Sequence, residues 1–197
     1  REGKSEFDIN QAYLAAVRQS DNQVPYNNII ALNENSAILH YMEQDVLAPN
    51  ESRSFLIDAG ASFHGYAADI TRTYCNGSIP NSSHFAELIK GMHQVTLSLA
   101  DMLKPGLPYS DIHIAAHAQV AQLLHQFDIV NLSPDDILAE QIVSTFFPHG
   151  IGHFLGLQVH DVAGHVADDR GTPNPPPAEH PFLRTTRMIE ARQVFTI

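Results

Sequence analysis

The stretch "FLIDAGASFHGYAADITRTY", residues 55–74, places one acid in each of two apolar runs, Asp58 in the first and Asp69 in the second. If the stretch forms two antiparallel strands that turn at Phe63 and His64, Asp58 lies directly opposite Asp69 on one side of a sheet. Like charges in that position destabilise the pair. The cost is roughly 4 kcal/mol at a separation of about 4 Å and an effective dielectric near 20. Something must therefore relieve the repulsion.

Three arrangements can relieve it. One acid can stay protonated, as in a carboxylate dyad. A neighbouring arginine, such as Arg72, can pair with one acid, or a divalent cation can lie between the two. The hairpin alone leaves these open, together with the alternative that the register differs and the acids lie on turns.

A second segment, "PHGIGHFLGLQVHD" (residues 148–161), carries His149, His153 and His160 among several glycines. Imidazole is the commonest metal ligand among side chains near neutral pH, and glycine allows a tight backbone and close approach. Simple packing of all three rings in a core is the alternative interpretation. Two carboxylates with one or more imidazoles form a mixed oxygen and nitrogen site, which suits Mn, Co, Zn or Fe better than Ca or Mg.

The remaining patterns predict an α+β fold in one domain, because strands paired as hairpins are combined with long helices grouped in the middle. Ser5 is expected to cap a first helix, with Asp8 three residues on. The other expected elements are a hairpin of residues 28–33 and 36–41, a helix capped by Ser82 or Ser83 that runs to about Leu103, a helix over 110–127 capped by Ser110 or Asp111, a short helix near 134–143, a proline-rich loop over about 164–181 and a strand around 193–197.

Composition excludes some partners. Eleven Lys and Arg against 22 Asp and Glu give a net charge of −11, which argues against a nucleic-acid partner. No apolar run approaches the length of a membrane span, so we expect no membrane association. The single cysteine, Cys75, rules out an internal disulfide and favours a reducing compartment, interpreted as the cytoplasm.

Several of the 12 histidines fall on predicted helices and are interpreted as solvated: His84, His93, His113, His117 and His125. His113 and His117 are four residues apart on one helix and could chelate a metal. No third ligand is apparent near them in the sequence, so solvation is the preferred interpretation.

The segments "LIDAGASFHGYAADITRTY" and "PHGIGHFLGLQVHDV" closely resemble the metal-binding segments of the prolidases (Xaa-Pro dipeptidases). These enzymes share the pita-bread fold with methionine aminopeptidase and aminopeptidase P. The resemblance runs from "SEFDI" through "VPYNNIIALNENSAILHY" to "VFTI". It implies a pita-bread domain that uses two divalent metal ions to hydrolyse dipeptides with a C-terminal proline. Mn²⁺ is the expected metal, with Co²⁺ or Zn²⁺ as alternatives.

The resemblance also implies the metal ligands. Asp58 would hold one metal with both oxygens, and Asp69 would bridge the two metals. His153 would complete the shell of one metal.

Substrate contacts follow from the same resemblance. His160 would act in catalysis by hydrogen-bonding the scissile carbonyl or the developing oxyanion. His149 and His40 would line the pocket and help to hold the substrate's proline carboxylate or the intermediate, and Tyr26 and Val159 match lesser pocket positions.

One departure concerns two further ligands. The first glutamate ligand of the family opens an "EPG" segment directly after "TI", where this sequence reaches Ile197, and the second lies further on. We therefore expect residues 1–197 to be one catalytic domain that is incomplete at its C-terminus, truncated before its last strands, without the small N-terminal domain of whole prolidases and with little activity alone.

Other functions stay open. The alternatives are an aminopeptidase P-like enzyme, a phosphotriester-cleaving relative and a non-catalytic pita-bread binding module. The small dipeptide is the expected partner. Relatives commonly pair as homodimers, and parts beyond this chain can carry that interface.

Overall fold

The computed structural model describes residues 3–78 and 82–197. The chain divides into two compact units. The first unit is Arg1–Ile89 with Leu155–Val159, and the second is Lys90–Phe154 with His160–Ile197. Compact units of this kind also occur inside single domains, so the expectation of one domain stays a prediction.

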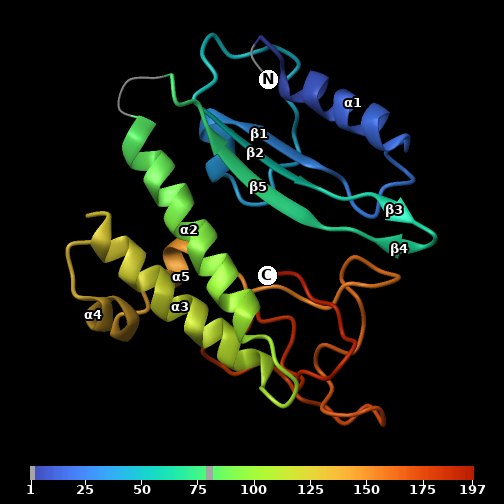
Figure 1. The fold of residues 1–197 in the computed structure, drawn as a ribbon, viewed down its shortest axis with the longest axis vertical. Helices are drawn as coiled ribbons and strands as arrows, with labels where there is room; N and C mark the ends of the chain where they lie inside the picture. Colours follow the sequence, from blue (N-terminus) through green and yellow to red (C-terminus); the bar gives the residue numbers. More distant parts are fainter. Residues whose placement is uncertain (1–2, 79–81) are drawn as a thin grey trace. The chain divides into compact units, whose positions relative to one another are not determined.

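The first unit contains a three-stranded antiparallel sheet with the order β1-β2-β5. Its strands are β1 (Ile29–Leu32), β2 (Ser54–Ala59) and β5 (Ile70–Cys75). The short strands β3 (Ser62–Phe63) and β4 (Tyr66–Ala67) extend the β2-β5 pair as a hairpin, and helix α1 (Glu6–Val17) lies beside β1 (Figure 1).

The expected capping of the first helix is confirmed. Ser5 Oγ accepts the Asp8 backbone N–H at 3.0 Å, and the Asp8 carboxylate accepts the Ser5 N–H at 3.1 Å. These reciprocal bonds satisfy two donors that a helix start leaves open.

A buried carboxylate fixes α1 against the following segment. Glu6 is 1% exposed. One oxygen accepts the Leu32 N–H at 2.7 Å and the Asn35 amide at 3.0 Å. The other accepts the Tyr41 hydroxyl at 2.7 Å and the Asp45 N–H at 2.9 Å. Four donors around one carboxylate satisfy its hydrogen-bonding capacity, so the acid tolerates burial.

The expected hairpin of residues 28–33 and 36–41 is wrong. Strand β1 pairs with β2 instead, and residues Asn33–Ala37 form the 3-10 helix η1. Asn33 has a positive φ of 53°, which asparagine tolerates better than most residues. Its side-chain oxygen also accepts the Arg53 and Ser54 N–H groups. This residue therefore ends the strand and joins its end to the start of β2.

The hairpin of the opening stretch forms, but its register differs from the expected one. Asp58 pairs with Thr71 rather than with Asp69. The turn lies at His64 and Gly65, both with positive φ, and not at Phe63 and His64. A two-residue turn with two positive φ values matches the twist of its strands and favours glycine.

The second unit is helical at its start. Helix α2 (Ser82–Met102) enters it at Lys90 and runs beside α3 (Tyr109–Gln126), followed by α4 (Pro134–Ala139) and α5 (Val143–Phe146) (Figure 1). Ser82 and Ser83, the expected caps of α2, lie within the helix. Residues 79–81, which precede them, lie outside the described part of the chain. Pro108, not Ser110 or Asp111, is the N-cap of α3.

Two apolar clusters form the core of the second unit. The larger joins the end of α2 to α3 and to the later loops; its buried members are Val95, Leu99, Tyr109, Ile112, Ala116, Leu123, Ile151, Leu183 and Ile189. The smaller lies where α3 meets α4 and α5; its members are Val120, Ala121, Leu124, Ile137 and Val143. These clusters give α3 a buried stripe along most of its length.

Residues 147–197 follow the helices as loops, with only isolated bridges among the described residues. The strand expected around 193–197 is wrong, because Phe195 makes a single bridge to Phe154. The loops are nevertheless anchored to α3 and its approach: the Tyr109 N–H donates to the Arg187 carbonyl and the Ile189 N–H to the Leu107 carbonyl.

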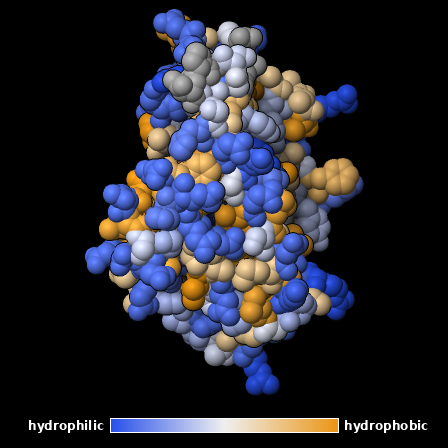
Figure 2. All heavy atoms as spheres, turned by 60° about the vertical axis from the view of Figure 1, so that its left-hand side comes forward, coloured by the Kyte–Doolittle hydropathy of each residue, from blue (hydrophilic) through white to orange (hydrophobic). Residues whose placement is uncertain are grey.

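Apolar side chains are scattered among hydrophilic ones on the face that Figure 2 shows.

Within the described residues, none of the helices has the length and apolar character needed to cross a membrane.

Candidate metal site

The two acids of the opening stretch lie on one face of the first unit and share a hydroxyl group. The Tyr26 hydroxyl lies 2.6 Å from Asp58 Oδ1 and 2.9 Å from Asp69 Oδ1. In the observed register Asp69 is a diagonal neighbour of Asp58, since it precedes Thr71 by two residues. A shift of two residues keeps a side chain on the same face, so the predicted proximity holds although the direct opposition does not.

The Tyr26 hydroxyl is therefore within hydrogen-bonding distance of two carboxylate oxygens at once. A tyrosine hydroxyl carries one hydrogen, so it can donate to only one carboxylate at full strength. Burial raises the pKa of Asp58 above its ordinary value, and the charge of Asp69 raises it further, whereas hydrogen bonds from Tyr26 and Thr71 lower it. Burial and the two acids also raise the pKa of Tyr26. A site that resists a second negative charge in this way is one that a cation stabilises.

The backbone beside the acids leaves room for nothing larger than glycine. A Cβ on Gly60 would lie 1.8 Å from the Ala68 carbonyl oxygen and 2.9 Å from the Tyr26 ring. The two arms of the hairpin approach closely at this point, and the Ala68 N–H donates to the Ala61 carbonyl at 2.9 Å. Gly60 thus lets Tyr26 lie against the strand that carries Asp58.

Arg72 does not relieve the repulsion on this face. Its Cα pairs with Ile57, and it adjoins Thr71, the partner of Asp58. Successive side chains of a strand point to opposite faces, so the Arg72 side chain leaves on the other side. Its guanidinium donates to the Thr71 carbonyl at 2.7 Å.

His153 belongs to the second unit and has the tautomer that a metal ligand needs. Its Nδ1 lies 2.9 Å from the Phe154 carbonyl oxygen. A carbonyl only accepts, so Nδ1 carries a proton and Nε2 is the ring nitrogen that could bind a metal. The His160 ring lies 4.5 Å away, edge to face, so these two predicted residues are brought together.

The segment around His153 is held by the last residues of the chain. The His153 N–H donates to Thr196 Oγ1 at 3.1 Å, and the Thr196 N–H returns a bond to the His153 carbonyl at 2.9 Å. Gly152 has a φ of 51°, and a Cβ there would lie 1.9 Å from the Thr196 carbonyl oxygen. This glycine is therefore required both for its conformation and for the close approach.

The remaining predicted residues are divided between the two units. His40 is exposed in a turn with a φ of 53°, and Val159 is half-buried in the first unit. His149 is half-buried in the second unit, edge to face with Phe182 at 6.4 Å.

The donor set fits a divalent cation. Within the first unit, the two carboxylates that meet at one hydroxyl supply oxygen ligands. Oxygen-rich sites with imidazole suit Mn²⁺ and its neighbours in the transition series.

The family model that describes metallopeptidase family M24 matches residues 1–197. The chain belongs to metallopeptidase family M24. Members are hydrolases that depend on a metal, so the donor set above agrees with the family. That two ions bind, and that they are manganese, stays a prediction.

Curated M24 relatives extend the comparison. A protein named Xaa-Pro dipeptidase from Pseudoalteromonas atlantica is 97% identical over 195 residues, which cover 99% of this chain and 44% of that protein. Another from Colwellia psychrerythraea is 55% identical over 196 residues, which cover 100% of this chain and 43% of that protein. The chain therefore spans less than half the length of these relatives.

Solved structures confirm the expected fold. Pseudomonas aeruginosa aminopeptidase PepP superposes with a TM-score of 0.77 at 26% identity, covering 98% of this chain and 40% of that one. A zinc-substituted Escherichia coli aminopeptidase P in complex with product gives 0.73 at 28% identity, covering 89% of this chain and 40% of that one. The α+β, pita-bread assignment of the M24 chain thus holds.

Two features escaped the sequence analysis. Thr71 hydrogen-bonds Asp58, which only the true register indicates. His113 and His117 are 2% and 9% exposed, so interpreting them as solvated is wrong, whereas His84, His93 and His125 are exposed as expected. His180 joins the two buried rings, and no local pattern links residue 180 to α3.

Proposed function

We propose that this chain is the part of an Xaa-Pro dipeptidase that carries its paired aspartates. The substrate would be a dipeptide whose second residue is proline. The observation that carries the proposal is the Tyr26 hydroxyl shared by Asp58 and Asp69. Its support from comparison is the 97% identical relative that bears this name.

The ligands in this chain would be Asp58, Asp69 and His153, and we propose two divalent ions, with Mn²⁺ preferred. When bound, such ions activate a water molecule and polarise the peptide carbonyl. Asp58 and Asp69 would supply the negative charge that holds them, and the Tyr26 hydroxyl would keep one carboxylate oriented. The Phe154 carbonyl accepts a hydrogen bond from His153 Nδ1, so Nε2 would be the atom that holds the metal.

Histidines would handle the substrate. His160 would donate a hydrogen bond to the scissile carbonyl as negative charge develops on its oxygen, an effect that can contribute about 10² to 10³ in rate. His149 and His40 would interact with the free carboxylate of proline, and Val159 would pack near it.

Proline explains why a dedicated enzyme is needed. An X-Pro bond has no N–H, so peptidases that bind this donor lose a contact. Recognition of the proline carboxylate instead would favour dipeptides over longer peptides.

By resemblance, two glutamate ligands complete the site, and neither matches a position in residues 1–197. We propose that the chain alone hydrolyses little for this reason. We also propose a cytoplasmic location and a homodimeric state.

The test uses the natural protein that contains this sequence, called the full-length protein below. It should hydrolyse X-Pro dipeptides when Mn²⁺ is added, and Asp58→Asn or Asp69→Asn should lower the rate by at least about 10³, since each removes a ligand of the activated water. Asp21→Asn, an exposed acid in the same unit, is the control and should keep full activity. Hydrolysis that survives either ligand change would sink the proposal.

The structural neighbours favour one second candidate, an aminopeptidase P-like activity, because the solved relatives bear that name. A panel that compares X-Pro dipeptides with longer peptides carrying proline second separates the two. Preference for the dipeptides supports the dipeptidase, and preference for the longer peptides supports the alternative.

A further inference from the structure

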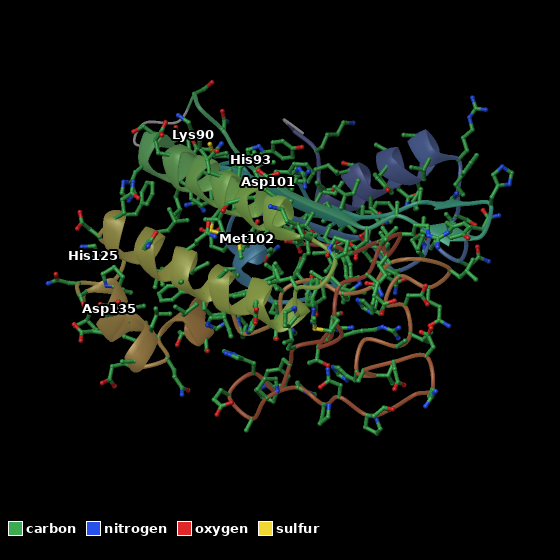
Figure 3. All side chains as sticks on the ribbon, turned by 60° about the horizontal axis from the view of Figure 1, so that its bottom comes forward. Lys90, His93, Asp101, Met102, His125 and Asp135 are labelled. Atoms are coloured by element: carbon green, nitrogen blue, oxygen red, sulfur yellow. The ribbon has the colours of Figure 1, made fainter. Side chains whose placement is uncertain are left out.

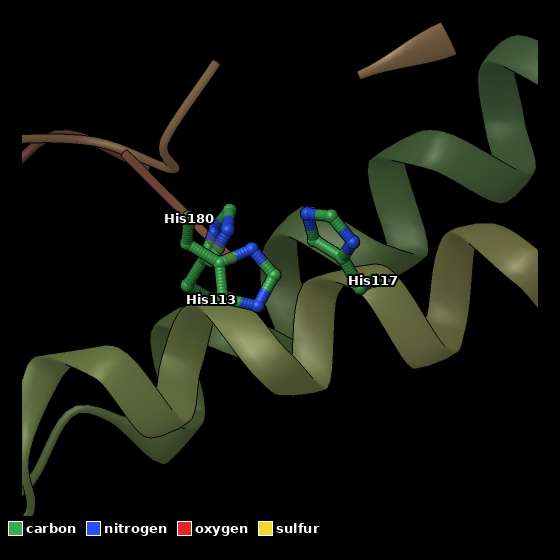
Figure 4. Close-up of side chains that lie close together, drawn as sticks. All are labelled: His113, His117 and His180. Carbon is green, nitrogen blue, oxygen red and sulfur yellow. The ribbon is translucent and has the colours of Figure 1, made fainter. Parts of the chain in front are cut away.

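Three histidine rings converge inside the second unit, in a cluster that the proposed peptidase function does not use. His113 and His117 lie one turn apart on α3, and His180 arrives from the proline-rich loop (Figure 4). One ligand nitrogen from each ring lies within 4.8 Å of the others. The ring centroids are 4.4 Å apart for His113–His117, 4.4 Å for His113–His180 and 4.9 Å for His117–His180.

We propose that His113, His117 and His180 form a second metal site, for Zn²⁺ or a similar borderline divalent ion, that ties the proline-rich loop to α3. Three imidazoles with an open fourth position make a common zinc environment. An all-nitrogen site of this kind favours Zn²⁺, Cu²⁺ or Ni²⁺ over Mg²⁺ and Ca²⁺. Its preference would therefore differ from that of the aspartate pair.

The loop that delivers His180 is held in place. The Leu183 N–H donates to the His180 carbonyl at 3.1 Å, the His180 N–H to the Pro177 carbonyl at 3.0 Å, and the Gly150 N–H to the Phe182 carbonyl at 3.3 Å. Leu183 is 1% exposed and belongs to the larger apolar cluster. The third ring is thus presented to α3 by a fixed backbone, which lowers the entropy lost when a metal is bound.

Burial affects the pKa of the two rings that α3 contributes. Burial lowers the pKa of His113 to about 3, and the nearby His117 and His180 add to the effect. Burial, with His180, also lowers the pKa of His117. Metal binding needs neutral imidazoles, and the lowered pKa values of His113 and His117 favour that form.

The three rings line a cavity of about 510 Å³, which His149 also lines. Phe147 forms an apolar wall, with its ring 5.8 Å from His113 and 5.5 Å from His117. Polar side chains of Gln141, Ser144 and Glu179 also line the cavity. A water molecule or a small anionic ligand could therefore complete the shell.

Two adjustments accompany binding. A tetrahedral site at Zn–N distances near 2.0–2.1 Å needs nitrogens about 3.3 Å apart, so the rings must move together by roughly 1 Å. His113 Nδ1 accepts the Ile151 N–H at a long 3.3 Å, which places its proton on Nε2. Coordination through Nε2 would shift that proton to Nδ1, which could then no longer accept from Ile151, so this weak bond would be lost.

The test isolates this site from the aspartate pair. The full-length protein carrying Asp58→Asn and Asp69→Asn is stripped with a chelator and titrated with Zn²⁺ by calorimetry, with bound metal counted by elemental analysis. One ion per chain is expected to bind. Adding His117→Gln or His180→Gln should weaken that binding by more than the 10–100-fold that loss of an outer-shell partner costs. His93→Gln, an exposed histidine on α2 (Figure 3), is the matched control.

Spectroscopy and stability provide independent readouts. Co²⁺ added to the same background should give the intense visible absorption of a tetrahedral ion, and His180→Gln should abolish it. Zn²⁺ should raise the melting temperature of the background but not of the His180→Gln protein. Because His180 is half-buried on a loop, this variant tests the proposal even if His117→Gln fails to fold. Zinc binding that is absent from the background, or that is equal with and without His180, would overturn the proposal and leave a packed cluster of aromatic rings.

Discussion

Replacing Asp58 with asparagine is predicted to stabilise the metal-free protein while weakening its binding of divalent cations. The aspartates meet at one hydroxyl, so without a cation each opposes the charge of the other. The asparagine side chain would keep an oxygen that accepts from Tyr26 and would add an amide that can donate to Asp69. The paired aspartates would therefore lower the free energy of unfolding of the metal-free protein.

The distances set the magnitude. The Tyr26 oxygen lies 2.6 Å from one carboxylate oxygen and 2.9 Å from the other, so these two oxygens are no farther apart than the sum of the two distances. Two unit charges at that limit repel by about 3 kcal/mol at an effective dielectric near 20. Replacing a charge-assisted hydrogen bond with a neutral one costs about 1 kcal/mol. The net stabilisation is about 2 kcal/mol at neutral pH.

The pH dependence follows from the direction of the shift. The pKa of Asp58 is raised in the folded protein, so the folded state binds the proton more tightly than the unfolded state does. The penalty is absent below the unfolded pKa of about 3.9 and grows as pH rises through the folded value. Wild-type apoprotein should therefore lose stability over that window, and Asp58→Asn should remove this part of the loss.

The assay is urea unfolding of the full-length protein in the presence of a chelator, repeated with excess Mn²⁺. Asp58→Asn should have the higher midpoint in chelator and the lower one in Mn²⁺. Asp21→Asn also removes one negative charge, from an exposed position, and should change the free energy of unfolding in neither condition by more than about 0.5 kcal/mol. If Asp58→Asn destabilises the chelated protein, the reasoning about repulsion is refuted.

Further predictions concern the supports of the two units. Glu6→Gln should lower the free energy of urea unfolding by about 3 kcal/mol, because an amide NH₂ would face backbone or hydroxyl donors. Exposed Glu51→Gln is the control. An equal loss in both variants would disprove the role of the buried network. Gly152→Ala should cost about 2–4 kcal/mol through overlap with the Thr196 carbonyl as well as its positive φ. Gly171→Ala, at a φ of 81° in open space, should cost only about 1–2 kcal/mol, and equal losses would contradict the close approach.

Local signals in the sequence predicted local structure well. Ser5 and Asp8 form the expected capping box because both partners lie within one helical turn. Asp58 and Asp69 share a face although their register was wrong, since the error was an even number of residues. The error was in the turn, which lies one residue later than expected, at His64 and Gly65, both with positive φ.

Long-range structure was less accessible. Strand β1 was expected to pair with the segment that follows it, but Asn33 ends the strand, and the chain returns through β2. His180 meets His113 and His117 only because the loop of residues 178–183 packs on α3. A contact between residues so far apart in the chain leaves no periodic signal, so a third ligand could not be inferred.

The most direct test of the central claim is the location of manganese in crystals of the full-length protein. Anomalous scattering should place an ion in direct contact with carboxylate oxygens of both Asp58 and Asp69. An ion that binds elsewhere and contacts neither of these two carboxylates would contradict the account.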